Sequence, residues 1–203
     1  MNKIFIILLL FLVAFSGCRQ QKNITKRYYV LEMPAQEKTV FKDTISNIDK
    51  FCEVSPVNVY PAFATNRIAL RGNTHEVEYF RNHEWAIRPA ENFTNIIIEF
   101  FERYEVFKGV DTRYWRTVPD YRLETTIYQL EVLENRKKIS ARINLEFRLI
   151  DIQTDQVILK HSADRYKQLE ENKINLFAAA ISEMFYQELI NTTKKITSTI
   201  MEQ

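Results

Sequence analysis

Histidine and cysteine are the residue types that most often carry metal or nucleophilic chemistry, and this chain has few of either. It contains three histidines, His75, His83 and His161, and two cysteines, Cys18 and Cys52. A zinc site needs three or four ligands, and some of them stand close together on one element. His75 and His83 are eight residues apart, and His161 is remote from both. The sequence therefore predicts exposed or hydrogen-bonded histidines, no metal site and no cofactor.

No arrangement of nucleophile and base stands out either. Ser162 follows His161, but a catalytic triad is defined by geometry and not by adjacency in sequence. No known signature surrounds Cys52, which favours a small buried side chain. The chain has three glycines, one of them Gly17, which are too few to form the glycine-rich loops that bind phosphate groups. We therefore predict a protein that is not an enzyme.

The N-terminus resembles the signal of a bacterial lipoprotein. Lys3 is followed by twelve apolar residues, 4–15, and then by Ser16-Gly17-Cys18. This run is shorter than the roughly 20 residues that span a bilayer, so residues 1–17 are predicted to be a cleaved signal peptide. The lipobox resemblance makes Cys18 the acylated first residue of the mature chain. Two or three acyl chains anchor a protein in lipid without a transmembrane helix.

Residues 18–27 comprise the acylated cysteine and a polar tether with four basic side chains. Arg19 stands where an aspartate would retain a lipoprotein in the inner membrane. By resemblance to this bacterial sorting rule, we expect Cys18 to insert into outer-membrane lipid, with the body on the periplasmic side.

Residues 28–203 are predicted to form a single domain, which suits a chain of 203 residues with 46% hydrophobic side chains. The 28 basic and 26 acidic side chains leave a net charge of +2, so no binding of nucleic acid is expected. Alternation of period two and helical spacing give the elements. In chain order they are strands at 28–33, 57–61, 67–71 and 77–79, a helix at 89–107, strands at 121–132, 139–149 and 157–163, and a helix at 172–195.

The run from Ile139 to Leu149 has the clearest pattern, because every second residue is apolar and the others are polar. It predicts an antiparallel strand with one buried and one wet face, so Leu145→Asp should unfold the domain and Arg142→Asp should be mild. The apolar parity of residues 121–132 slips near Ile127, which predicts a β-bulge there.

Both halves of the domain read as strand, hairpin and helix, and they meet in the stretch 109–119. The fold class is therefore α+β: a two-layer sandwich of a mostly antiparallel sheet with two helices on one face.

Aromatic side chains are abundant, with 14 Phe, 10 Tyr and 2 Trp. Trp85 is expected to anchor the core, but the total exceeds what two helices and one sheet face must bury. Since aromatic residues are enriched in interfaces, those in or beside loops are candidate partner contacts. They are Phe63, Tyr79, Tyr114 and Trp115.

The segment 57–102 resembles the ABC-type transport auxiliary lipoproteins, the PqiC-like accessories of MCE-domain lipid transporters. The residues that carry the resemblance are Val57-Asn58-Val59, Pro61, Phe63, Arg67-Ile68-Ala69-Leu70-Arg71 and Asn82-His83-Glu84-Trp85-Ala86. Ala64 and Thr65 depart from the family's usual Leu and Asp, so no role of that acidic residue carries over. The resemblance implies a non-catalytic, outer-membrane-anchored accessory that contacts an MCE-domain protein. Some members assemble into rings, which makes a homo-oligomer possible here.

Two other functions remain open at this point. One is a different envelope lipoprotein, such as an activator of a peptidoglycan synthase. The other is a periplasmic hydrolase, which a pocket joining His161 or Cys52 to carboxylates would favour.

Overall fold

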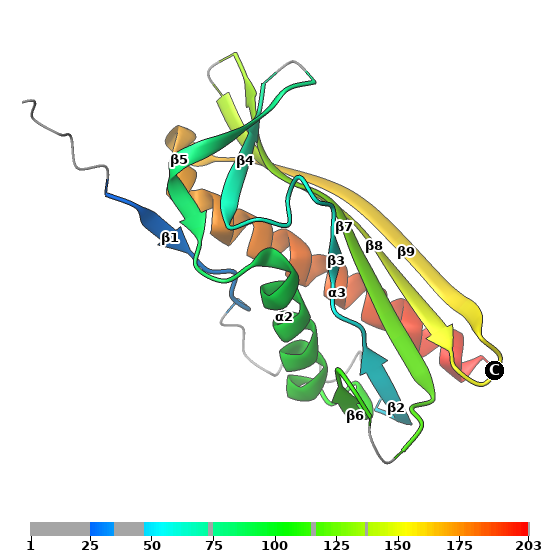
Figure 1. Cartoon of the computed structure of the whole chain (residues 1–203). Helices are drawn as coiled ribbons and strands as arrows, with labels where there is room; N and C mark the ends of the chain where they lie inside the picture. The colour runs from blue at the N-terminus through cyan, green and yellow to red at the C-terminus, as the bar shows by residue number, and fades with distance from the viewer. Residues whose placement is uncertain (1–24, 35–46, 73–74, 115–116, 137, 203) are drawn as a thin grey trace, which may run out of the picture.

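The protein folds into a nine-stranded sheet with two long helices on one of its faces (Figure 1). The computed structural model describes residues 25–34, 47–72, 75–114, 117–136 and 138–202. The strands are β1 (Arg27–Tyr29), β2 (Ile48–Val54), β3 (Asn58–Val59), β4 (Arg67–Arg71), β5 (Val77–Trp85), β6 (Phe107–Asp111), β7 (Tyr121–Asn135), β8 (Lys138–Asp151) and β9 (Gln156–Gln168). The long helices are α2 (Pro89–Arg103) and α3 (Phe177–Met201), and two short 3-10 turns precede α3. Among the described residues, no helix is long and apolar enough to cross a bilayer.

Strand β7 holds the sheet together. One of its edges pairs antiparallel with β8 along its whole length, and β8 pairs antiparallel with β9. The other edge is shared by β2, β3 and β4, which pair with β7 in parallel at successive positions. Beyond β4 the sheet continues through β5 to β1, and beyond β2 it continues to β6. The predicted α+β fold with its mostly antiparallel sheet is confirmed, and the short parallel pairs add to it.

The predicted β-bulge is confirmed as well. The register between β7 and β8 shifts between Ile127 and Gln129, so that Tyr128 is the extra residue. Leu123 and Ile127 before the bulge are buried, and so are Leu130 and Val132 after it. The apolar alternation shifts by one residue at this point of the sequence, and the extra residue compensates for that shift. The apolar side chains before and after the bulge therefore lie on the same, buried face of the sheet.

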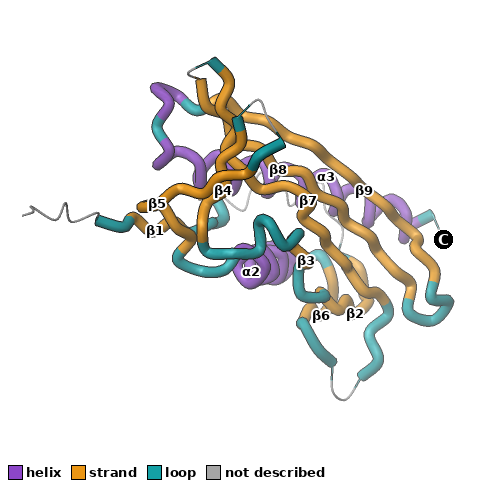
Figure 2. The backbone as a smooth tube through the Cα atoms, turned by 45° about the horizontal axis from the view of Figure 1, so that its top comes forward, coloured by secondary structure: helices purple, strands orange, loops and turns teal. Residues whose placement is uncertain are grey.

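Both helices lie on the same side of the sheet (Figure 2), as predicted. Phe185 of α3 contacts Phe93 of α2 and Phe147 of β8, with ring centres 4.6 and 5.9 Å apart. Trp85 is buried at the end of β5 against Phe177, which confirms it as a core anchor. The core is thus a layer of aromatic and aliphatic side chains between sheet and helices.

The predicted helix bounds need correction. Helix α2 ends at Arg103, four residues earlier than expected, because Glu105 adopts a left-handed conformation with φ of 50°. The chain reverses there, and Phe107 starts β6. Helix α3 starts at Phe177 and not at residue 172, because the preceding residues form the 3-10 turns, and it runs on to Met201.

Candidate functional site

The predicted acylation site, Cys18, and the predicted contact residue Trp115 lie outside the described residues. Phe63 lies inside them, and its expected exposure is wrong, since only 5% of it is accessible. The Phe63 N–H donates to the Tyr60 carbonyl at 2.7 Å, which closes a tight turn. This loop therefore places the ring of Phe63 in the core.

Tyr79 and Tyr114 are half-buried. The Tyr79 hydroxyl donates to the Ala62 carbonyl at 2.9 Å, and the Arg67 guanidinium lies 4.3 Å from the centre of the Tyr79 ring. Tyr114 lies edge-on to Phe51 with ring centres 5.9 Å apart, and burial raises the pKa of Tyr114 to about 12. Both tyrosines keep some accessible surface, so both stay candidates for partner contact.

The surroundings of Cys52 and His83, two residues considered for chemistry, indicate structural roles. Cys52 has no accessible surface, and burial raises the pKa of its thiol far above the ordinary value. His83 is buried with its Nδ1 atom 2.7 Å from the Tyr29 hydroxyl, and burial, followed by Arg27, lowers its pKa. A neutral His83 then accepts a hydrogen bond from Tyr29 and helps to fix β1 on β5.

His161 is joined to a carboxylate, as the hydrolase hypothesis requires. Its Nε2 atom lies 2.7 Å from Glu188 Oε2, and its Nδ1 atom lies 2.9 Å from Lys195 Nζ. The Arg165 Nε donates to Glu188 Oε1 at 2.6 Å. Burial alone would raise the pKa of Glu188, but the hydrogen bonds from His161 and Arg165 outweigh it and lower that pKa. The four side chains therefore form a compact ionic cluster between β9 and α3.

This cluster lacks a nucleophile among the described residues. Ser162 is next in sequence, but alternation along β9 turns it to the other face of the sheet, where its hydroxyl donates to Glu146 at 3.1 Å. A depression of about 280 Å³ beside Glu188 and Arg165 is also lined by Met184 and other α3 side chains. The charged groups of the His161 cluster already bind one another. The geometry therefore favours a structural role, in which the cluster holds α3 on β9, over a catalytic site. Nor do three His, Cys, Asp or Glu side chains gather into a metal site in the described part of the chain.

The face of the sheet opposite the helices carries a second ionic network. Glu131 of β7 has no accessible surface, although it lies on this face. Arg71 Nη2 approaches its Oε2 at 2.8 Å, and Arg142 Nη1 approaches its Oε1 at 3.3 Å. Arg142 also binds both carboxylate oxygens of Asp164, at 3.1 and 2.8 Å, and lies 5.0 Å from the Tyr166 ring centre. This outer-face network connects β4, β7, β8 and β9.

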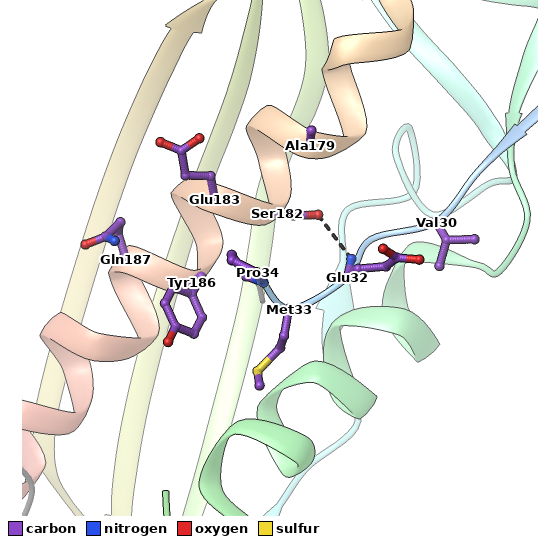
Figure 3. A pocket seen from close by; sticks show the side chains of 9 residues that line it. All are labelled: Val30, Glu32, Met33, Pro34, Ala179, Ser182, Glu183, Tyr186 and Gln187. Carbon is purple, nitrogen blue, oxygen red and sulfur yellow. Dashed lines mark hydrogen bonds between the residues drawn. The ribbon is translucent and has the colours of Figure 1, made fainter. Parts of the chain in front are cut away.

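A groove of about 560 Å³ lies between α3 and the N-terminal strap, which we define as residues 27–34 (Figure 3). The strap is β1 and its extended continuation, in place of the longer strand predicted at 28–33. Two contacts fasten it: the ammonium of Lys26, the residue before the strap, binds Glu84 at 2.6 Å, and the Glu32 N–H donates to Ser182 Oγ at 3.1 Å. The groove is lined by Val30, Glu32, Met33, Pro34, Ala179, Ser182, Glu183, Tyr186 and Gln187.

The sequence analysis missed this strap groove for a simple reason. Its two walls come from segments about 150 residues apart, as the contact between Glu32 and Ser182 illustrates. The only available signal was the spacing of Ala179, Glu183 and Gln187, which places them on one exposed stripe of α3.

Comparison with known proteins bears on the whole domain. The family model for the ABC-type transport auxiliary lipoprotein component matches residues 29–189. A crystal structure of a Xanthomonas campestris protein of the DUF330 family is similar, with a TM-score of 0.68, 15% identity, and coverage of 88% of this chain and 96% of that one. A second crystal structure, of a protein without assigned function, has a TM-score of 0.66, 16% identity, and coverage of 85% and 99%. No curated protein matches the chain.

Proposed function

Because the chain belongs to the family of ABC-type transport auxiliary lipoprotein components, we propose that it is the outer-membrane-anchored periplasmic accessory of an ABC system with an MCE-domain protein. In this role it binds its partner and helps lipid pass between the membranes. It catalyses no reaction itself.

The observation that carries the proposal is the family match, which spans nearly the whole folded body. The acylation signal at Cys18 supplies the anchor, and the tether that follows it lets the body stand away from the membrane. The ion pairs of the protein support a binding role over a catalytic one. Within the outer-face network, and within the His161 cluster, the buried charged side chains are paired with each other.

The arrangement of the body suggests where a partner would bind. The tether joins the body at β1, whereas the connection between β6 and β7 lies at another end of the molecule (Figure 1). Val118 in this connection is 78% exposed, and Tyr114, in the same connection, is half-buried. We assign the first contact with the MCE-domain protein to this connection, and assign Tyr79 with Arg67 to a second contact or to a neighbouring copy of the chain.

Site-specific photo-crosslinking in cells tests the proposal. A photoreactive residue at position 114 or 118 should capture the MCE-domain protein encoded with the transporter, identified by mass spectrometry. The same residue at Val157, an exposed valine (43%) on the edge strand β9 away from this connection, is the control. Capture of a peptidoglycan synthase alone would favour the other envelope function, and hydrolytic turnover by the purified protein would contradict both.

Cys18→Ala provides a separate test of the anchor. The acylated protein should sediment with outer-membrane vesicles after cell fractionation, and the variant should lose this association. Unmodified Cys18 in the membrane-bound protein would contradict the anchoring mechanism without affecting the partner assignment.

A further inference from the structure

We propose that the open edge of β9 pairs with the same edge of a second copy of this chain, antiparallel and with Ser162 opposite Ser162. This inference goes beyond the proposed function, because it concerns the contact of the protein with itself and not with its transport partner. It is carried by the unpaired edge of β9, by the charges along this strand and by the central position of Ser162.

Strand β9 is paired on one side. It lies antiparallel to β8, and in the described part of the chain no strand pairs with its other side, so β9 is the outermost strand here (Figure 1). Its thirteen residues, Gln156–Gln168, exceed the usual strand length of about 3–10 residues and include no proline. Proteins commonly protect an edge by a short strand or a proline, and an edge without either is a template for another strand.

The charges along β9 distinguish one self-pairing from all others. Opposite side chains of an antiparallel pair point to the same face, so two copies with their helices on one side pair about a residue that faces its own copy. With Ser162 at this centre, Lys160 of each copy lies opposite Asp164 of the other. A centre at Lys160, Asp164, Arg165 or Lys167 would instead place two like charges opposite each other. The remaining centres bring no opposite charges within the strand together.

The surroundings of Lys160 in a single copy favour this contact. In the register of β8 with β9, Lys160 lies directly opposite Arg148, and like charges in such a position repel. Lys160 binds Glu146 at 3.0 Å, but its side chain is still 62% exposed. Asp164 binds Arg142 of β8, and 37% of its side chain is exposed. The second copy therefore brings an accessible carboxylate to the side of Lys160 that faces away from Arg148.

The position of Ser162 makes full use of the strand. Ser162 is the middle residue of β9, six residues from either end, so pairing about it leaves no overhang. The register shift between β8 and β9 lies near Ile158, so the regular part of the contact is 159–165 in both copies. On the helix side Arg165 lies opposite Leu159, and the aliphatic stem of the arginine can cover the leucine.

Disulfide formation in intact cells, by the full-length protein, tests this register. Ser162→Cys places two thiols directly opposite, about 4.5–5.5 Å apart between Cβ atoms, which a disulfide can join. Tyr166→Cys is the matched control, because Tyr166 is exposed on the same face of β9 but would lie eight residues, about 27 Å, along the strand from its own copy. Cys52 has no accessible surface and should contribute no background.

After brief oxidation, a non-reducing gel should show at least tenfold more disulfide-linked dimer for Ser162→Cys than for Tyr166→Cys. Adding Lys160→Glu to Ser162→Cys opposes two acids and should lower the dimer yield at least fivefold, while the urea midpoint of the reduced protein shows that it remains folded. Native mass spectrometry of the unaltered, acylated protein in detergent should find two chains in one complex.

Equal dimer yields from Ser162→Cys and Tyr166→Cys would indicate random collision and overturn the proposal. A single chain in native mass spectrometry would overturn it too, and so would photo-crosslinking from position 162 to the MCE-domain protein instead of a second copy. A protein that remains single but captures its MCE-domain partner from position 114 or 118 refutes only this inference. One that forms the Ser162 dimer but captures no partner refutes only the proposed function.

Discussion

Replacing Arg142 by methionine tests the outer-face network, because it removes the guanidinium and keeps much of the stem. Glu131 has no accessible surface, and Arg142 is the residue that binds its Oε1 atom. Arg71 still binds Oε2 in the variant. One oxygen of a buried carboxylate is then left without a partner, so the folded state loses stability.

The size of the loss follows from the surroundings of each group. An orphaned oxygen of a buried charged group costs about 1–3 kcal/mol. Asp164, whose side chain is 37% exposed, loses a bidentate partner but regains water, which adds roughly 0.5 kcal/mol. The lost contact with the Tyr166 ring adds about 0.5 kcal/mol more. Arg142→Met should therefore lower the free energy of unfolding by about 2–4 kcal/mol, and Arg142→Asp should cost more because it adds a third carboxylate. The mild effect expected of Arg142→Asp from alternation alone is thus corrected.

Arg148→Met is the matched control, because Arg148 lies on the same strand and face. Its partner Glu124 is 3.4 Å away, and the two side chains are 44% and 38% exposed, so the expected loss is at most about 0.5 kcal/mol. Equilibrium urea unfolding at pH 7.5, followed by tryptophan fluorescence, measures both variants. Equal midpoints for the two variants would refute the reasoning, since burial of Glu131 would then have no energetic consequence.

Three further predictions concern other parts of the fold. Leu145→Asp should abolish cooperative unfolding, because Leu145 is fully buried and a charge there has no partner; a cooperative transition by calorimetry would contradict this. Gly109→Val should destabilise the protein by about 1–3 kcal/mol in urea, because a Cβ atom at this position lies 2.7 Å from the ring of Phe51, and Phe51→Ala should relieve the clash. His83 has a lowered pKa, so the unfolded chain takes up its proton first and stability falls as the pH drops below 6.5 toward the folded pKa. His83→Gln should flatten this dependence in urea midpoints measured from pH 7.5 to 5, and an unchanged slope would show that another group causes it.

Alternation and helical spacing predict the elements whose pattern is regular. Strand β8 has strict alternation because one of its faces is buried and its partners on both sides are long. The bulge near Ile127 was predictable because a shift of one residue moves every later side chain to the other face. Trp85 was predictable as a core residue from its size alone.

Other elements have no such pattern. Strand β2 was missed because its register slips between Ile48 and Phe51, which breaks the alternation. Strand β6 was missed because Phe107 continues the apolar spacing of α2, and only the left-handed Glu105 separates the two elements. The strap groove and the Glu131 network depend on which segments become neighbours, and a single sequence carries no direct signal of that.

The position of β7 in the chain has a consequence for folding during synthesis and export. Strands β2, β3 and β4 all precede it, and each needs β7 as a neighbour in the sheet. A chain that emerges from its N-terminus therefore presents three strands with open edges before residues 121–135 are available to cover them. Such edges readily pair with other chains. The first half of this protein should thus depend on a holding chaperone until the second half arrives, and the sheet should form from β7 outward.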